Sequence, residues 1–228
     1  MFRSKTILAI MLLCACLNTS ALAAENDSAP SAAVAREVNL TYPRIDGLGE
    51  AGDKMTRTIA NEIDAFAEIF RKYEYSGQVG YKVKYNHSPL LSVTLDEMYY
   101  MYHAAHPMSY LRAYTFDTRT GKILQLADLF SKDADYRSRL NKFITDKIAE
   151  DNIPLLNASA VPAIKPEQEF YLSRDALVIY YQRYEFTSYA QGFLKFSVPY
   201  KQIADLLNPE FAPMLTTEHK PDCQLCSP

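Results

Sequence analysis

The sequence predicts an α+β fold, and three observations support this prediction. Segments in which apolar and polar residues alternate, as in strands with one buried face, are distinct from two longer segments with helical periodicity. The strand-like segments follow one another in groups, which favours α+β over a doubly wound α/β fold. Tyrosine is frequent, with 17 residues, which is typical of antiparallel sheets with half-exposed faces.

The first half of the chain is predicted to contain one helix among four strands. Residues 37–42 alternate in polarity, and Pro43 is expected to end this strand. Asp53 is expected to cap a helix that buries one apolar face and runs to about residue 71. Asp96 and Glu97 are interpreted as a bulge in one of the strands that follow. These three strands are close in sequence and are expected to form an antiparallel meander; they comprise residues 80–86, 91–102 and 111–117.

The second half is predicted to contain one long helix and three shorter strands. A tight turn at Gly121 is expected to precede these elements, because glycine adopts a positive φ without strain. One helical turn is expected over residues 126–130, and Asp135 is expected to begin a helix that ends near Glu150. Pro199 is expected to open a last short helix over residues 199–207. The predicted strands are residues 169–172, 176–181 and 193–198.

The N-terminus has the features of an export signal. Arg3 and Lys5 precede an uncharged, mostly apolar run of residues 6–17, which is shorter than the roughly 20 residues needed to span a bilayer core. A small-x-small cleavage motif, Ala21-Leu22-Ala23, follows this run. Residues 1–24 are therefore predicted to be a signal peptide, and the protein is expected to be periplasmic, attached to the cell surface or secreted.

A lipoprotein signal is the alternative interpretation of the same segment. Residues 13–16, Leu-Cys-Ala-Cys, resemble a lipobox, which would end the signal at residue 15 and attach a lipid to Cys16. A membrane association is expected only in that case. Residues 25–36, rich in Ala, Ser and charged residues with one proline, are expected to be a flexible linker under either interpretation.

The C-terminal segment, residues 209–228, is predicted to be a peripheral tail. It contains Cys223 and Cys226, and a Cys-x-x-Cys pair of this kind is expected to close a small disulfide in an oxidising compartment. A redox-active pair of this spacing should open a helix after a strand. Here Pro221 precedes the pair and Pro228 ends the segment, so we do not expect redox catalysis.

The charge of the chain argues against nucleic acid as a partner. The sequence has 24 basic and 27 acidic residues, and removal of Arg3 and Lys5 with the signal peptide would leave 22 basic residues and a net charge of −5. Nucleic-acid binding depends on neutralising phosphates with a basic surface, and the sequence contains no basic stripe with interleaved aromatic residues.

Motifs for catalysis, cofactors and metals are weak or missing in the sequence. Residues 47–52 spell Gly-x-Gly-x-x-Gly, but the preceding strand alternates in polarity, unlike the buried parallel strand of a dinucleotide fold, so we expect a flexible turn and no cofactor. His103 and His106 are three residues apart and would point to opposite faces of a strand. Ala104, Ala105 and Pro107 allow a bend, so we expect these histidines in a turn or at the edge of a sheet. With no third ligand close in sequence, we expect neither a metal site nor catalytic residues.

From residue 37 to about 208, the order of motifs resembles the RsiV-like extracytoplasmic domain. This domain of unknown function occurs in RsiV-type anti-sigma factors and before the catalytic part of PdaC-type peptidoglycan deacetylases. The matching segments are 42–45 (YPRI), 83–86 (VKYN), 105–107 (AHP), 114–122 (YTFDTRTGK), 126–130 (LADLF) and 184–192 (YEFTSYAQG).

The resemblance implies two consecutive small units, each an antiparallel sheet with a packed helix. We expect an N-terminal unit over residues 37–110 and a C-terminal RsiV-like unit over residues 111–208. RsiV-type members are similar to sensors that bind lysozyme directly. The sequence shows neither the cytoplasmic part of an anti-sigma factor nor a deacetylase domain.

The residues and the resemblance together predict a non-enzymatic binding domain that recognises an extracytoplasmic partner, either a protein such as lysozyme or cell-wall glycan. Tyrosine is a good recognition residue because its ring buries much area at low entropic cost, although most such rings in a sheet serve packing. The alternatives are a structural envelope protein without a soluble ligand and a cell-wall-modifying hydrolase centred on His106. The predicted binding residues are Tyr99, Tyr100, Tyr102, His106, Tyr184 and Tyr189.

Overall fold

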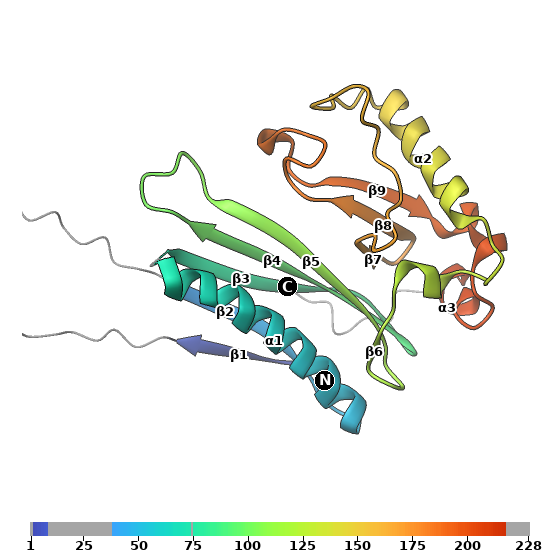
Figure 1. The fold of residues 1–228 in the computed structure, drawn as a ribbon. Helices are drawn as coiled ribbons and strands as arrows, with labels where there is room; N and C mark the ends of the chain where they lie inside the picture. The colour runs from blue at the N-terminus through green and yellow to red at the C-terminus, as the bar shows by residue number, and fades with distance from the viewer. Residues whose placement is uncertain (1, 9–37, 74, 218–228) are drawn as a thin grey trace, which may run out of the picture.

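A computed structural model describes residues 2–8, 38–73 and 75–217. They form two sheets with packed helices, which confirms the predicted α+β class (Figure 1). Among the described residues, no helix is long and apolar enough to cross a membrane.

The first sheet contains six strands in the order in which they occur along the chain. Neighbouring strands run antiparallel, except for β2 and β3, which are parallel. The parallel pair follows from the helix between these two strands, since a parallel connection needs a crossover segment. The elements are β1 (Phe2–Leu8), β2 (Val38–Ile45), α1 (Gly49–Tyr73), β3 (Ser76–His87), β4 (Leu90–Tyr100), β5 (Met108–Asp117) and β6 (Lys122–Ile123).

The second sheet contains three antiparallel strands, and α2 packs on one of its faces. Asp135 caps α2 as predicted, because its carboxylate accepts a hydrogen bond from the Ser138 backbone N–H at 3.3 Å. The elements are a 3-10 turn η1 (Leu126–Leu129), α2 (Tyr136–Glu150), β7 (Phe170–Leu172), β8 (Ala176–Tyr181), a 3-10 turn η2 (Tyr189–Gln191), β9 (Leu194–Pro199), 3-10 turns η3 (Tyr200–Gln202) and η4 (Ala204–Leu206), and α3 (Ala212–Thr216).

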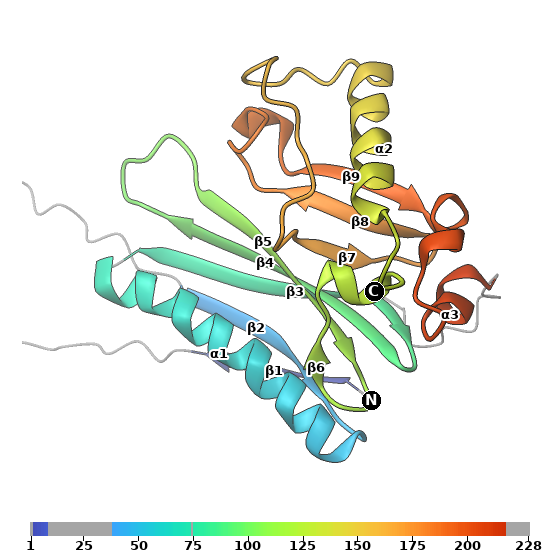
Figure 2. The same ribbon diagram turned by 45° about the vertical axis from the view of Figure 1, so that its right-hand side comes forward.

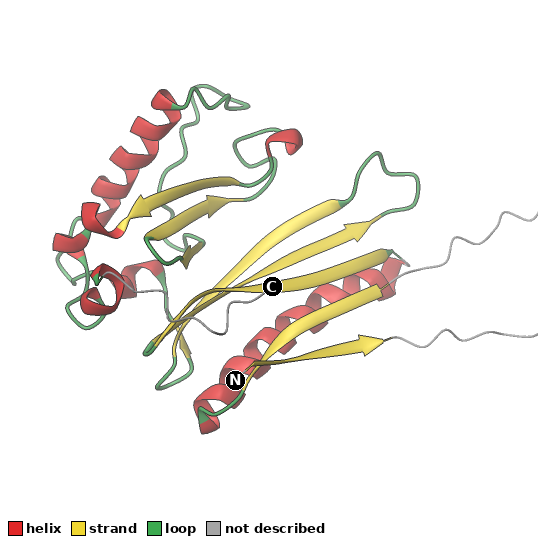
Figure 3. Ribbon diagram, turned by 180° about the vertical axis from the view of Figure 1, so that it is seen from behind, coloured by secondary structure: helices red, strands yellow, loops and turns green. Residues whose placement is uncertain are grey.

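Helix α1 covers one face of the first sheet, and the second sheet packs against part of the other face (Figures 2 and 3). The apolar face of α1 predicted from the sequence is the buried one. On the opposite face, Leu111 packs with Tyr171, Val178 and Tyr180 of the second sheet, and the Ser92 hydroxyl accepts a hydrogen bond from the Leu172 backbone N–H. The buried residues predicted for α1 were Ile59, Ile63, Phe66, Ala67 and Phe70.

Several predicted boundaries in the first sheet are wrong. Strand β2 continues through Pro43 to Ile45, because β3 pairs only with Val38–Leu40 and no hydrogen bond to β3 is lost at Pro43. Helix α1 begins at Gly49 instead of at Asp53, so the turn before it is shorter than predicted. Gly52 lets the helix start close to β2, because a Cβ there would lie 2.7 Å from the Ile45 carbonyl oxygen. The irregularity in β3–β4 pairing lies at Val83 and Tyr85, and β4 has no bulge at residues 96–97.

The division between the two sheets and the end of the fold also differ from the prediction. A boundary after residue 110 cuts β5, and the first sheet continues to Ile123. The predicted helix over 199–207 is two 3-10 turns. Residues 209–217 are part of the fold, since Phe211 and Leu215 are buried in the core that contains α2. Within the predicted signal peptide, residues 2–8 form β1 at the edge of the first sheet. Cys16, Cys223, Cys226 and the predicted linker lie outside the described residues.

Candidate functional site

Three of the six predicted binding residues meet where two distant loops touch. His106 lies in the loop between β4 and β5, while Tyr184 and Tyr189 lie between β8 and β9. The His106 ring stacks on the Tyr189 ring, with 3.8 Å between centroids and an angle of 17° between planes. The Tyr184 hydroxyl lies 3.1 Å from Nε2 of His106. Figure 1 shows both loops at the same end of the molecule.

Hydrogen bonds define the state of the His106 ring. Its Nδ1 lies 3.1 Å from the Pro107 carbonyl oxygen, which can only accept, so Nδ1 carries the proton in the neutral ring. Nε2 is then the acceptor for the Tyr184 hydroxyl. The Tyr189 hydroxyl donates to the same Pro107 carbonyl at 2.8 Å. Nε2 of His106 and the Tyr189 hydroxyl therefore join the two loops, while Nδ1 bonds within the β4–β5 loop.

Arg183 extends this stack on the other side of Tyr189. Its guanidinium carbon lies 4.4 Å from the Tyr189 ring centroid and 4.9 Å from that of Phe193. Its Nη1 also donates to the Tyr189 carbonyl oxygen at 2.7 Å. A cation between two ring faces is attracted by both. We call the group His106, Arg183, Tyr184, Tyr189 and Phe193 the stacked loop site.

The local sequence shapes the loop that carries Tyr184. Tyr184 has a positive φ of 64°, an uncommon conformation for a tyrosine. On one side, the Glu185 carboxylate accepts a hydrogen bond from the Gln182 backbone N–H at 3.0 Å and pairs with Lys165. On the other side, Ser188 and Gln191 form a capping box at η2. Surrounding contacts that fix a strained residue in this way are typical of functional loops.

Tyr184 is the exposed part of the stacked loop site. Its side chain is 47% exposed, whereas Tyr189 is covered on one face by His106 and on the other by Arg183. Tyr102 is 60% exposed and contacts the His103 ring within the same β4–β5 loop. The exposed part of the site therefore consists mainly of the Tyr184 side chain, while His106 and Arg183 are partly buried.

Tyr99 and Tyr100 do not reach the stacked loop site. The Tyr99 ring stacks between Tyr75 at 5.6 Å and Tyr110 at 6.2 Å, on the face of the sheet covered by α1. Burial, followed by hydrogen bonding to Tyr110, raises the pKa of Tyr99 to about 12. The Tyr100 hydroxyl donates to the Ala104 carbonyl oxygen at 3.0 Å. Tyr99 is thus a packing residue, and Tyr100 supports the start of the β4–β5 loop.

A cluster of charged side chains around the buried Glu97 was not predicted from the sequence. Glu97 on β4 is 1% exposed, and its Oε2 lies 3.6 Å from Nε of Arg112 on β5. Arg112 also contacts Glu62 of α1 at 3.6 Å and Glu169, next to β7, at 3.7 Å. Glu97 occupies the buried face that continues from Val93 and Leu95. The signal in the sequence was an acidic residue in line with the apolar residues of the buried face. From the sequence, this acidic residue was predicted to be part of a bulge instead.

The environment of Glu97 favours its neutral form. The pKa of Glu97 is raised to about 7, mainly because burial removes the carboxyl group from water. Arg112 lowers this pKa, whereas Glu62 and Glu169 raise it further. Oε1 of Glu97 has no hydrogen-bond partner among the described residues. One guanidinium shared by three carboxylates leaves an excess of negative charge when all three are ionised, so protonation of the most buried one relieves it.

Both histidines lie outside the strands, in keeping with the turn expected around His106. His103 and His106 belong to the β4–β5 loop, and His103 is exposed with a positive φ of 67°. Within residues 2–8, 38–73 and 75–217, no three His, Cys, Asp or Glu residues are grouped as metal ligands would be.

Comparisons with known proteins show similarity to a family of unknown function. Residues 127–201 match the model of DUF3298, described as a protein family of unknown function. A DUF3298 family protein from Pseudomonas aeruginosa has a similar fold, with a TM-score of 0.58 and 17% identity over 75% of this chain and 85% of that one. A DUF3298 family member from Bacteroides fragilis has a TM-score of 0.57 and 17% identity over 80% and 88%. No curated protein matches the chain. Residues 127–201 are therefore similar in sequence to DUF3298, and the fold over 75–80% of the chain is similar to that of two solved DUF3298 proteins.

Proposed function

We propose that this chain is an exported, non-enzymatic domain that binds an extracytoplasmic protein through the stacked loop site, with lysozyme as the first candidate. The observation that carries the proposal is the contact between His106 and Tyr184, 78 residues apart, which leaves the Tyr184 ring 47% exposed. Two loops are thereby joined into one surface.

The rigidity of this surface supports a role in binding. The stack of Phe193, Arg183, Tyr189 and His106 holds both loops before any partner arrives. Loops that are ordered in advance lose less entropy on association, so more of the contact energy remains as affinity. An exposed tyrosine adds a large contact area with few rotatable bonds.

Charge and the resemblance to RsiV-like domains support a basic protein partner. Without residues 1–24, the chain would carry 22 basic and 27 acidic residues. A net negative charge steers a basic protein toward the domain and disfavours anionic wall polymers.

Export is tested by intact-mass analysis of the protein from its native host. The expected N-terminus lies near Ala24, or the mass includes a lipid on Cys16. Processing would remove β1, which is the edge strand and pairs only with β2, so the other five strands of the sheet would stay paired. A cytosolic protein that retains residue 1 would contradict the proposal.

Partner binding is tested by calorimetry of the purified chain with a C-type lysozyme at low and physiological salt. Binding by charge steering alone should disappear at physiological salt, whereas a specific interface should persist. Tyr184→Ala should weaken binding about tenfold or more, as expected for an aromatic hot spot, and Tyr189→Ala should do the same by dismantling the stack.

Two variants serve as controls for this binding experiment. Tyr184→Phe retains the ring and removes only the hydrogen bond to His106, so most of the affinity should remain. Leu48→Ala changes an exposed apolar residue next to the N-terminus of α1, away from both loops, and should have no effect. Absence of heat at both salt concentrations, or equal affinity of all variants, would overturn the proposal and favour a structural envelope protein.

A further inference from the structure

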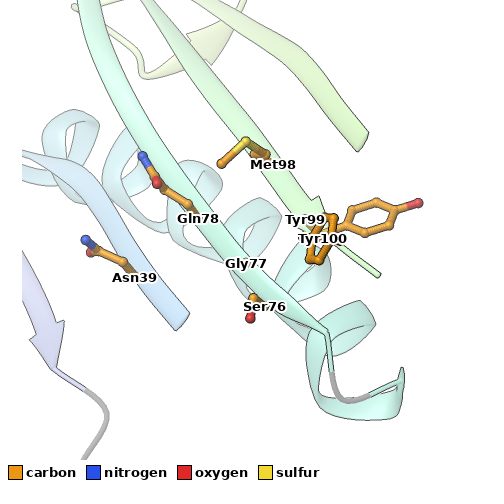
Figure 4. A pocket seen from close by; sticks show the side chains of 7 residues that line it. All are labelled: Asn39, Ser76, Gly77, Gln78, Met98, Tyr99 and Tyr100. Carbon is orange, nitrogen blue, oxygen red and sulfur yellow. The ribbon is translucent and has the colours of Figure 1, made fainter. Parts of the chain in front are cut away.

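A second polar and aromatic surface lies on the face of the first sheet opposite α1, apart from the stacked loop site. Here the strands carry a hollow of about 140 Å³ (Figure 4). Strand register explains its composition, because Asn39 pairs with Gln78 across β2 and β3, and Gln78 pairs with Met98 across β3 and β4. The next row pairs Ser76 with Tyr100.

The hollow contains two side-chain amides that are not used by the fold. No side-chain hydrogen bond of Asn39 or Gln78 is found among the described residues, and both residues are exposed. Each offers two N–H donors and one carbonyl acceptor. Because directly opposed residues on neighbouring strands lie about 5 Å apart, a single small ligand can reach both amides.

Apolar surface lies beside these amides. Met98 is 36% exposed and Tyr100 is 39% exposed. The hydroxyl of Tyr100 is occupied by the Ala104 carbonyl oxygen, which leaves its ring as the contact surface. No charged side chain is among the described residues that line the hollow.

The shape of the hollow is set by the sheet. On the other face of β3, the Phe70 ring of α1 packs directly against Gly77, so the strand cannot move toward the helix. The second sheet packs elsewhere, over Leu111 and Ser92, and leaves this end of the first sheet uncovered. The amides therefore stand on paired strands in an open, preformed position.

We propose that this hollow binds one unit of a neutral sugar. Sugar hydroxyls donate and accept hydrogen bonds as side-chain amides do, and the C–H face of a sugar ring packs on tyrosine and methionine. An anionic ligand would find no cation here. A purely apolar ligand would bury the two amides without partners, which is unfavourable. A volume of about 140 Å³ suits a single ring at the end of a glycan and is smaller than typical drug-sized pockets.

The test uses a neutral N-acetylglucosamine trisaccharide as probe, followed by NMR chemical-shift changes on the full chain. A Kd near 1 mM is expected, which would approach saturation at about 10 mM probe. Gln78→Ala and Asn39→Ala should each weaken binding roughly three- to tenfold, as expected for one neutral hydrogen bond. Tyr100→Ala should weaken it by a similar factor, whereas a sulfated analogue of the probe should not bind better than the neutral sugar.

Two controls separate this proposal from the proposed protein-binding function. Lys82→Ala changes an exposed residue further along β3 on the same face and should leave sugar affinity unchanged. Tyr184→Ala should also leave it unchanged, although it disrupts the stacked loop site. No shift changes up to about 10 mM probe, or affinity that is insensitive to Gln78→Ala, Asn39→Ala and Tyr100→Ala, would overturn the sugar site without affecting the lysozyme experiment.

Discussion

Replacing Glu97 with glutamine removes a buried charge and keeps the shape of the side chain. Glu97 is 1% exposed, and Arg112 beside it also contacts Glu62 and Glu169. In the variant, Arg112, whose side chain is 42% exposed, retains these two carboxylates as partners. Glu97→Gln is therefore expected to remove the titratable carboxyl group of Glu97 with little loss of packing.

The sign and size of this effect follow from the pKa of Glu97. Burial raises it from an ordinary value of 4.5 to about 7, so the folded protein binds a proton that the unfolded chain releases. The stability that this proton supplies is fully present below pH 4.5 and is lost as the pH rises through about 7. At about 1.4 kcal/mol for each pKa unit, the total is about 3 kcal/mol.

The assay is denaturant unfolding of the wild type and of Glu97→Gln between about pH 5 and 8. The variant should gain stability relative to the wild type as the pH rises, up to about 3 kcal/mol near pH 8. The difference between the two proteins cancels the titration of other groups that both share. Asp96→Asn is the matched control, since Asp96 is next in sequence but exposed and paired with Lys82 on the surface, where ion pairs contribute about 1 kcal/mol or less.

Parallel pH profiles of the wild type and Glu97→Gln would refute this reasoning. They would mean that Glu97 is ionised throughout this range and that Arg112 compensates for its burial. A variant that is several kcal/mol less stable than the wild type at pH 8 would show that the ion pair with Arg112 outweighs desolvation.

Three further predictions concern the second unit and the C-terminal segment. Leu140→Ala should destabilise the fold by about 2–5 kcal/mol in denaturant unfolding, because Leu140 lies on the buried face of α2 and is fully buried; the exposed Leu156→Ala should change stability by less than about 0.5 kcal/mol. Asp135→Ala should cost about 1 kcal/mol in the same assay through loss of the α2 cap, and an unchanged stability would contradict that role. Replacing Cys223 and Cys226 with serine should leave the Tm nearly unchanged, since so small a loop contributes less than the roughly 3 kcal/mol of a 15-residue loop; a large drop in thermal unfolding would show that this segment is packed.

The local parts of the fold were predictable because they depend on residues near one another in sequence. Helix α2 was predicted from its cap at Asp135 and its periodic apolar face, and α1 from the face that includes Ile59 and Phe70. The turn at Gly121 has the positive φ of 67° that its glycine indicated. The boundaries of β2 and α1 were not predictable, because Pro43 is accommodated where β3 no longer pairs with β2 and the start of α1 depends on the close approach of Gly52 to Ile45.

The candidate site was predictable in its residue types, and its assembly was not. The abundance of tyrosine and the resemblance led to the predicted binding residues, and three of these six belong to the stacked loop site. Arg183 was missed because a cation shows its role only when two rings are found on either side of it. Tyr99 was assigned to binding because sequence alone does not show which face of β4 is covered by α1.

The sequence by itself determined the α+β class, the order of most elements and the faces that α1 and α2 bury, since periodicity directly reports which side of an element avoids water. Only the tertiary structure decided that β2 and β3 are parallel, that the first sheet extends to Ile123, and that Glu97 is buried beside Arg112. It also decided that His106 meets Tyr184. These contacts join segments that are far apart in the chain. Each strand or loop could pack against many other apolar surfaces of the molecule. The choice among them depends on the packing of the whole molecule, which no local pattern records.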